Sequence, residues 1–193
     1  ACYSILKEAG KRCNVYTSPH IQKINERFVF NNKQLDDDEL VSLFLEIEKI
    51  NNNEQITFFE ILTACFFYKA AQYPDNINLI EAGLFHRFDA TNILKNNLAS
   101  IITSISIDHL DWLPANQRSI DKIIYEKTSN LLNSNLIIAK QHPISTLKKI
   151  KKTIDKNQSD KYYFNEDFSF SDEDKNFFYY EDKFGGLKLP EPN

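Results

Sequence analysis

Two apolar runs in this sequence end in side chains that could bind a metal ion. In LIEAGLFHRFDATN (residues 79–92), the run ends in Glu81 and is followed by a glycine and a cluster of charged and small polar residues. In SIITSISIDHLDWL (residues 100–113), the run ends in Asp108 and His109. This pattern is typical of a buried parallel strand that delivers chemistry to the edge of a sheet. We therefore expect the two strand ends to lie side by side and to share a metal.

A third strand end adds a hydroxyl group to this set. The short apolar run at residues 13–16 is followed by TSPH, in which Pro19 prevents further strand pairing. Because ligands bind outside the carboxyl ends of parallel strands, Ser18, Glu81 and His109 are candidate metal ligands. Together they would suit Mg²⁺ or Mn²⁺ that carries several waters and a phosphate oxygen. Taken singly, a Glu or His at a strand end is more often a hydrogen-bonded structural residue, and this alternative stays open here.

For other polar residues, the neighbouring sequence gives less support to a functional role. Lys127 lies within YEKTSN on a predicted helix, where a lysine usually belongs to a solvated face. Glu60 stands at the start of a long helix, and capping is its default role. Arg87 and Asp89 flank each other after the strand, which favours a local structural pairing. His20 could contact a ligand or only stabilise its loop.

The segments around these residues alternate between two periodicities. The helix pattern covers residues 1–9, 36–50, 58–72, 119–133 and 143–156, and the strand pattern covers residues 13–16, 26–30, 76–82, 99–107 and 135–140. Acidic residues suit the first turn of the second helix, and Thr57 caps the third. This alternation predicts an α/β fold, with a mostly parallel sheet flanked by helices.

The expected pattern changes near the C-terminus. After residue 157 the sequence alternates like short antiparallel strands, with a turn or bulge at Gly185–Gly186. We therefore predict an α/β core over residues 1–156 and a β-rich extension over residues 157–193. Within the core, the strand at residues 26–30 is expected at the sheet edge.

The composition is that of an ordinary globular protein. Of 193 residues 42% are apolar. The net charge is −4, and because acidic and basic residues are interspersed, the sequence predicts no basic face for nucleic acid. The apolar runs are too short to span a bilayer, and no signal peptide opens the chain. Three widely spaced cysteines favour a reducing, cytoplasmic location. Since methionine and an N-terminal helix cap are absent, we expect the sequence to begin within a larger protein.

Several short motifs occur in a specific order along the chain. They are NVYTSPH, INERF, ITFFEILTA, LIEAGLFHRFDATN, SISIDHLDWL, YEKTSN and LKLPEPN. In the same order they resemble YTSPHL, RERI, TYFEALTA, EVGLGGRLDATN, SIGLDHTEFLG, REKAGI and the last central-domain strand of the folylpolyglutamate synthase and dihydrofolate synthase family, within the Mur ligase superfamily. The resemblance covers nearly all of the chain and is specific in its combination of motifs.

This resemblance implies roles for individual residues. Ser18, Glu81 and His109 match the family's magnesium ligands, the same trio that the strand ends single out. Lys127 matches the lysine that the family carbamylates, which gives a carboxylate that helps to organise a second magnesium. Contacts to the pterin substrate are matched by four residues, namely Thr57, Phe88, Asp89 and Ala90.

The implied reaction is ATP-dependent amide formation. The carboxylate of dihydropteroate or of a folate takes the γ-phosphoryl group of ATP, and the amine of L-glutamate attacks the acyl phosphate. Mg²⁺ neutralises charge on the transferred group. We further expect a cytoplasmic monomer with small-molecule substrates.

The sequence departs from the family pattern in several places. No GxxxxGK[ST] phosphate-binding loop occurs, so we expect a central ATP-binding domain that lacks the P-loop and the C-terminal domain and is inactive alone. Phe85–His86 replaces the family's Gly–Gly pair beside the metal site. Two alternatives stay open: a non-catalytic pterin- or metal-binding module, and another Mur-type amide ligase. TFFE and FDATN favour the folate branch over the latter.

Overall fold

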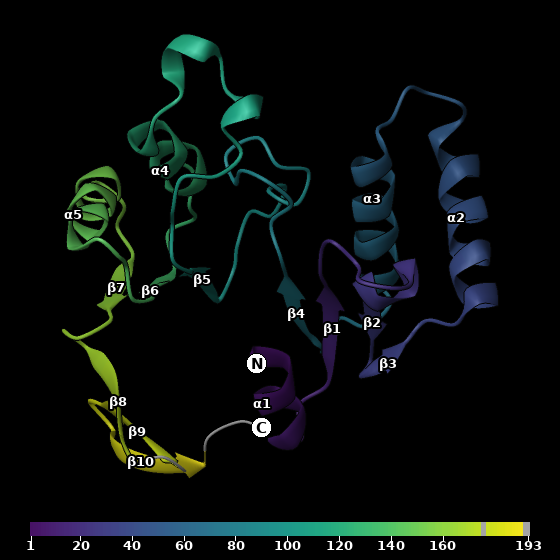
Figure 1. The fold of residues 1–193 in the computed structure, drawn as a ribbon. Coiled ribbons are helices and arrows are strands. Elements are labelled where there is room, and N and C mark those ends of the chain that lie inside the picture. Colours follow the sequence, from purple (N-terminus) through teal and green to yellow (C-terminus); the bar gives the residue numbers. More distant parts are fainter. Residues whose placement is uncertain (175–176, 191–193) are drawn as a thin grey trace. The chain divides into compact units, whose positions relative to one another are not determined.

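The chain folds into two units, Ala1–Ile93 and Leu94–Asn193, each with its own sheets and helices (Figure 1). The structure is a computed structural model that describes residues 1–174 and 177–190, with the backbone alone at residues 172–174. The predicted division at residue 156 falls inside the second unit, and the end of the LKLPEPN motif lies outside the described residues. In the described part, no helix combines the length and apolar character needed to cross a membrane.

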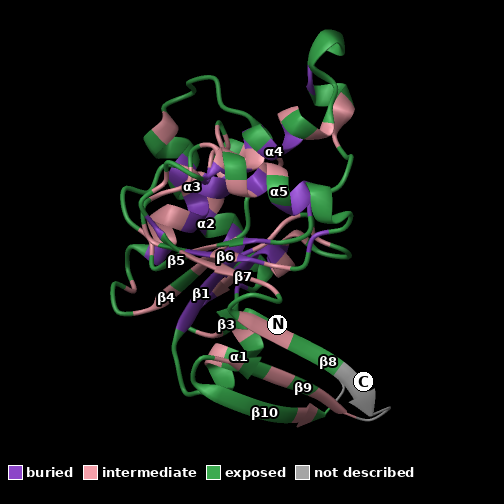
Figure 2. Cartoon of the chain, turned by 90° about the vertical axis from the view of Figure 1, so that its left-hand side faces the viewer, coloured by how far each residue is buried: buried purple, intermediate pink, exposed green. Residues whose placement is uncertain are grey.

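The sheet of the first unit has the strand order β3-β2-β1-β4. Its strands are β1 (Cys13–Tyr16), β2 (Phe28–Phe30), β3 (Lys33–Gln34) and β4 (Ile77–Ile80). β1 runs parallel to β4 and antiparallel to β2, and it is buried along its whole length (Figure 2). The sheet therefore combines one parallel strand pair with an antiparallel edge.

The expected edge strand at residues 26–30 is wrong in position and length. Residues 24–27 form the 3₁₀-helix η1 (Ile24–Arg27), and β2 lies between β1 and β3. The expected turn follows, because Asn31 and Asn32 adopt left-handed φ values of 51° and 65° that lead into β3. A strand of only two residues thus occupies this edge.

Three α-helices complete the first unit. α1 (Cys2–Glu8) is followed by Gly10, whose φ of 73° suits a glycine after a helix. α2 (Asp37–Asn51) and α3 (Phe58–Ala70) lie side by side, and their apolar faces share a core with the sheet (Figure 1). That core contains stacked aromatic rings, among them Tyr16, Phe28, Phe30 and Phe66.

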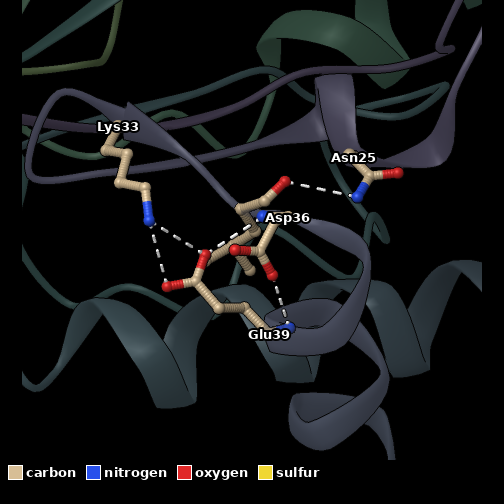
Figure 3. A network of polar contacts seen from close by, with 5 residues as sticks. Asn25, Lys33, Asp36 and Glu39 are labelled. Carbon is tan, nitrogen blue, oxygen red and sulfur yellow. Dashed lines mark hydrogen bonds and ion pairs between the residues drawn. The ribbon is translucent and has the colours of Figure 1, made fainter.

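Side-chain caps fix where these helices begin. Asp36 accepts from the Glu39 backbone N–H at 2.9 Å, and the Glu39 carboxylate accepts from the Asp36 N–H at 3.0 Å (Figure 3). Lys33 of β3 adds an ion pair to Glu39 at 3.4 Å. This reciprocal capping box satisfies N–H groups that a helix start leaves without partners.

The second unit contains a parallel sheet with the order β5-β6-β7. Its strands are β5 (Ala99–Ile102), β6 (Asn135–Ile138) and β7 (Asp160–Tyr163), and its helices are α4 (Ile120–Thr128) and α5 (Ile144–Thr153). Both helices start within one residue of prediction but end earlier, and β5 stops five residues before the predicted residue 107. Two 3₁₀-helices, η2 (Leu110–Trp112) and η3 (Ala115–Gln117), follow β5.

The C-terminal strands correct one expectation and confirm another. β7 is parallel to β6, so the antiparallel pattern expected after residue 157 does not apply to it. β8 (Phe168–Asp174), β9 (Phe177–Asp182) and β10 (Gly185–Pro190) form the expected antiparallel sheet. The β9–β10 turn ends at Gly185, whose φ of 131° favours glycine.

The parallel strands and flanking helices confirm the predicted α/β class. The cysteines are free thiols, and Cys13 and Cys65 are buried. Burial raises the pKa of the Cys65 thiol to about 12, so this thiol stays protonated at neutral pH.

Candidate functional site

Ser18 and Glu81 meet at the carboxyl ends of β1 and β4. The last residue pair of these parallel strands is Tyr16 with Ile80, and the Glu81 N–H donates to the Tyr16 carbonyl at 2.9 Å. The Ser18 N–H donates to Glu81 Oε2 at 2.9 Å. A hydroxyl-bearing residue and an exposed carboxylate are therefore neighbours at the edge where ligands bind in such sheets.

The donor atoms at this edge fit a hard divalent cation. Carboxylate and hydroxyl oxygens are ligands that Mg²⁺ and Mn²⁺ prefer. In the described part of the chain, no three His, Cys, Asp or Glu side chains group so that they could hold a metal by themselves. A cation here would therefore need other oxygen ligands besides Glu81, such as the Ser18 hydroxyl, water or phosphate.

A dense set of hydrogen bonds holds the loop that carries Ser18. The Glu26 carboxylate accepts from the backbone N–H groups of Ile21, Gln22 and Lys23 at 2.8–2.9 Å. The hydrogen bond from the Ile21 N–H is the main reason why the pKa of Glu26 lies below its ordinary value of 4.5. The Thr17 N–H and hydroxyl bond to carbonyls of η1, at Arg27 and Glu26. The loop after β1 is thus fixed on η1.

His109 and Lys127 belong to the second unit. His109 has a left-handed φ of 55° at the start of η2, and its Nε2 lies 3.1 Å from Asp108 Oδ2. Lys127 lies half-buried in the last turn of α4, beside Glu126, which is buried and pairs with Lys122 at 2.7 Å. Since Ser18 and Glu81 belong to the first unit, a metal shared by all three predicted ligands stays a prediction.

The predicted substrate contact Thr57 has a structural role at the start of α3. Its hydroxyl donates to Glu60 Oε2 at 2.6 Å, and the Thr57 N–H donates to the same carboxylate at 2.8 Å. The hydrogen bond from the Thr57 hydroxyl is the main reason why the pKa of Glu60 is lowered. The capping roles predicted for Thr57 and Glu60 are therefore confirmed, and the substrate contact stays a prediction.

The loop after β4 contains the other predicted substrate contacts. Asp89 Oδ1 accepts from the Thr91 N–H at 3.0 Å and hydroxyl at 2.6 Å, and Oδ2 accepts from the Leu84 N–H at 3.0 Å. Phe88 is 82% exposed, and the Arg87 guanidinium lies 4.0 Å from its ring centre. The described hydrogen bonds of Asp89 thus shape its own loop, and Ala90 beside it is half-buried.

Gly83 has a packing role that no sequence pattern predicts. A Cβ at this position would lie 2.5 Å from Phe59 Cζ and 3.0 Å from Asp89 Oδ2. The loop after β4 therefore packs tightly on the first turn of α3. This contact links the loop that carries residues 88–90 to the helix that Thr57 caps.

A cavity of about 720 Å³ lies elsewhere, in the second unit. Its walls come from β7, the turn after it and the β8–β9 pair, and they are mainly aromatic and acidic, including Tyr162, Phe168, Tyr180, Phe184, Glu166 and Glu181. None of the predicted site residues lines it.

No family model matches the chain. Curated proteins similar to it include dihydrofolate synthase/folylpolyglutamate synthase of Escherichia coli K12, with 37% identity over 121 residues, and of Buchnera aphidicola from Schizaphis graminum, with 35% identity over 154 residues. These matches cover 62% and 78% of the chain but 28% and 36% of the relatives. The chain thus spans about a third of the length of these curated relatives.

Solved structures agree with the fold. The bifunctional folylpolyglutamate synthase/dihydrofolate synthase of Yersinia pestis, complexed with AMPPNP and manganese, superposes with a TM-score of 0.83 and 28% identity, over 99% of this chain and 45% of that one. E. coli FolC in complex with DHPP and ADP gives 0.81 and 30%, over 98% and 44%. By sequence motifs, relatives and fold, the chain belongs to the dihydrofolate synthase/folylpolyglutamate synthase family.

Proposed function

We propose that the protein containing this chain is an ATP-dependent ligase that joins a pteroate or folate carboxylate to the amine of L-glutamate. The observation that carries the proposal is the Ser18–Glu81 pair at the carboxyl ends of β1 and β4, in a chain of this family. The names of the relatives support the activity, and the solved relatives with AMPPNP and manganese, or with DHPP and ADP, support nucleotide, divalent-metal and pterin ligands.

The proposed reaction proceeds in two steps. A carboxylate oxygen of the substrate attacks the γ-phosphorus of ATP, and the bond to the ADP oxygen breaks. The glutamate amine then attacks the acyl carbon, phosphate leaves with the bonding electrons, and the nitrogen loses a proton. When bound, a divalent cation, in our proposal Mg²⁺, would supply positive charge to offset that on the transferred phosphoryl group.

The residues of the chain have distinct parts in this proposal. Ser18, Glu81 and His109 would hold the cation through oxygen and imidazole nitrogen. Lys127 supplies a further carboxylate after its amine forms a carbamate with CO₂. The pterin ring lies against the loop after β4 and the start of α3, where Phe88, Asp89, Ala90 and Thr57 contact it. The tight packing of Gly83 on Phe59 supports placing these two segments in one substrate site.

A glutamate incorporation assay tests the proposal on the protein as its gene encodes it. We expect labelled glutamate to enter dihydropteroate, tetrahydrofolate or both, with one ADP and one phosphate released per bond. Chelation by EDTA should abolish turnover, and Mg²⁺ should restore it. Binding of a pterin without turnover of either substrate would instead favour the binding module. Light scattering on the same sample tests our expectation of a monomer.

The role of Lys127 has its own test. Lys127→Ala should reduce turnover by about 10²–10³-fold, the usual cost of removing one preorganised group that stabilises charge in a catalytic site. Acetate should restore part of this activity, because it replaces the missing carboxylate. The exposed Lys148 of α5 offers a control, and Lys148→Ala should leave turnover unchanged. Full activity of Lys127→Ala would exclude the carbamate.

A further inference from the structure

Arg27 is a nearly buried cation that lacks a carboxylate partner. Its side chain is 8% exposed, and across the described residues no carboxylate oxygen lies within 4.0 Å of its guanidinium. Its side-chain hydrogen bond runs from Nε to His20 Nδ1 at 3.0 Å. Buried arginines are normally paired, because an uncompensated charge is costly to remove from water. The guanidinium therefore lacks the counter-ion that its environment calls for.

The position of Arg27 ties it to the strand ends of the first unit. It is the last residue of η1, and its carbonyl accepts from the Thr17 N–H at 3.2 Å. The next residue, Phe28, pairs with Tyr16, the last residue of β1. Arg27 thus lies at the carboxyl end of β1, beside the loop that carries Ser18.

The guanidinium is fixed before any ligand arrives. Because His20 Nδ1 accepts from Arg27 Nε, a neutral His20 carries its proton on Nε2. The loop from His20 onward is held by the three backbone N–H groups that donate to Glu26. A donor that is already oriented loses little freedom when it binds, which favours tight and specific recognition.

The remaining donors indicate what would bind. A guanidinium has five N–H groups in a planar fork, and His20 takes one of them. The other four belong to the two terminal amino groups, which match carboxylate and phosphate oxygens in a bidentate manner. The Glu81 carboxylate forms no ion pair with it in the described structure, and Glu81 Oε2 accepts from the Ser18 N–H.

We propose that Arg27, oriented by His20, is an anion-binding residue that receives a carboxylate or phosphoryl oxygen of the substrate beside Ser18 and Glu81. The identity of the substrate rests on the proposed function, whereas the anion site itself does not. A ligase of this kind brings both sources of oxygen to the strand ends, in the acceptor carboxylate and in the γ-phosphoryl group.

Simple anions test the site independently of turnover. Unfolding midpoints of the encoded protein are measured in rising inorganic phosphate or acetate at constant ionic strength, for wild type, Arg27→Gln and Arg27→Lys. The exposed Lys33→Gln is the matched control for loss of one positive charge in the same unit. We expect at least one anion to raise the wild-type and Lys33→Gln midpoints clearly more than that of Arg27→Gln, because a bound anion stabilises only the folded state.

Equal anion shifts in wild type and a folded Arg27→Gln variant would overturn the proposal. If Arg27→Gln does not fold by circular dichroism, Arg27→Lys decides the question. It keeps the charge but loses the fork and the Nε–H to His20, so we expect the anion shift to shrink. An unchanged shift in Arg27→Lys would then count against the proposal.

Calorimetry with the substrates identifies the bound group. A loss of affinity of about tenfold or more for MgATP in Arg27→Gln assigns the phosphoryl oxygen, and the same loss for the pterin substrate assigns the carboxylate. Unchanged affinity for both in a folded variant would overturn the proposal. A protein that binds simple anions through Arg27 but turns over neither pterin substrate would refute the proposed function and leave the anion site intact.

Discussion

The ends of β1 and β4 in the first unit differ from the end of β5 in the second. Glu81 directly follows β4, and its backbone N–H extends the ladder to Tyr16. His109 follows β5 only after an irregular stretch, and its left-handed backbone is supported locally by Asp108. A residue that adjoins a strand is thus placed by the sheet, whereas a residue farther along is placed by its neighbours.

The largest loss of activity is expected for substitution of Glu81, the residue that the sheet holds in place. Glu81→Gln should reduce kcat/KM by about 10³-fold, because it removes the carboxylate charge at the proposed cation. Asp108→Asn should cost only about tenfold, since our proposal makes Asp108, which contacts His109, a positioning residue and not a ligand of the cation. Both values come from steady-state kinetics in rising Mg²⁺, which should rescue Asp108→Asn more than Glu81→Gln.

A reversed order would change the interpretation of both strand ends. If Asp108→Asn were the more damaging variant, Asp108 would be a cation ligand and Glu81 a structural partner of Ser18. Unfolding curves of the two variants are the control, because Glu81 also accepts the Ser18 N–H and its loss could loosen the loop.

A smaller effect distinguishes how tightly the loops of the two units pack. Gly83→Ala in the first unit should destabilise the fold by about 1–3 kcal/mol, because the new methyl group collides with the Phe59 ring. Gly186→Ala in the second unit is the matched control, since its Cβ would meet the Tyr180 carbonyl at an ordinary 3.6 Å. Urea unfolding measures both, and equal losses would show that the Gly83 loop can move aside.

The sequence predicts what is encoded locally. The bounds of β1, the capping of α2 by Asp36 and the capping of α3 by Thr57 follow from short-range patterns of residue type. Ser18 and Glu81 could be identified as neighbours because both lie within two residues of the ends of strands of one parallel pair. Local chemistry and sheet topology give the same answer in these cases.

Other features depend on partners that one sequence does not reveal. β2 reads as an edge strand because the two-residue β3 is too short to show a period of its own. β7 reads as antiparallel because its pairing with β6 is set by tertiary structure. The bond between Arg27 and His20 joins residues of two motifs, and nothing in their types demands it. An unpaired buried charge becomes visible only once burial is known.

A modest effect compares helix caps in the two units. Thr57→Ala should cost about 1 kcal/mol or somewhat more, because it removes the hydroxyl that accepts from the Glu60 N–H and donates to the Glu60 carboxylate, while the backbone half of the capping box stays. Ser119→Ala, which removes the single bond to the Lys122 N–H of α4, should cost less. Chemical denaturation measures both. If Thr57→Ala also raises the KM for the pterin substrate, the result would support the predicted contact between Thr57 and the pterin. Ser119→Ala should leave this KM unchanged.

The smallest expected effect is a pH dependence of the loop that carries Ser18. The backbone N–H groups of Ile21, Lys23 and Gln22 hold the pKa of Glu26 below its ordinary 4.5, so the folded state favours the charged carboxylate. This contribution to stability is present above pH 4.5 and is lost as the pH falls through the lowered folded-state pKa. Glu26→Gln lacks it at every pH, so the unfolding midpoints of wild type and variant should converge on acidification. Glu54→Gln, at an exposed position of the same unit, should follow the wild-type curve. A gap between wild type and Glu26→Gln that stays constant from neutral to acid pH would show that the loop is held by packing and not by the carboxylate.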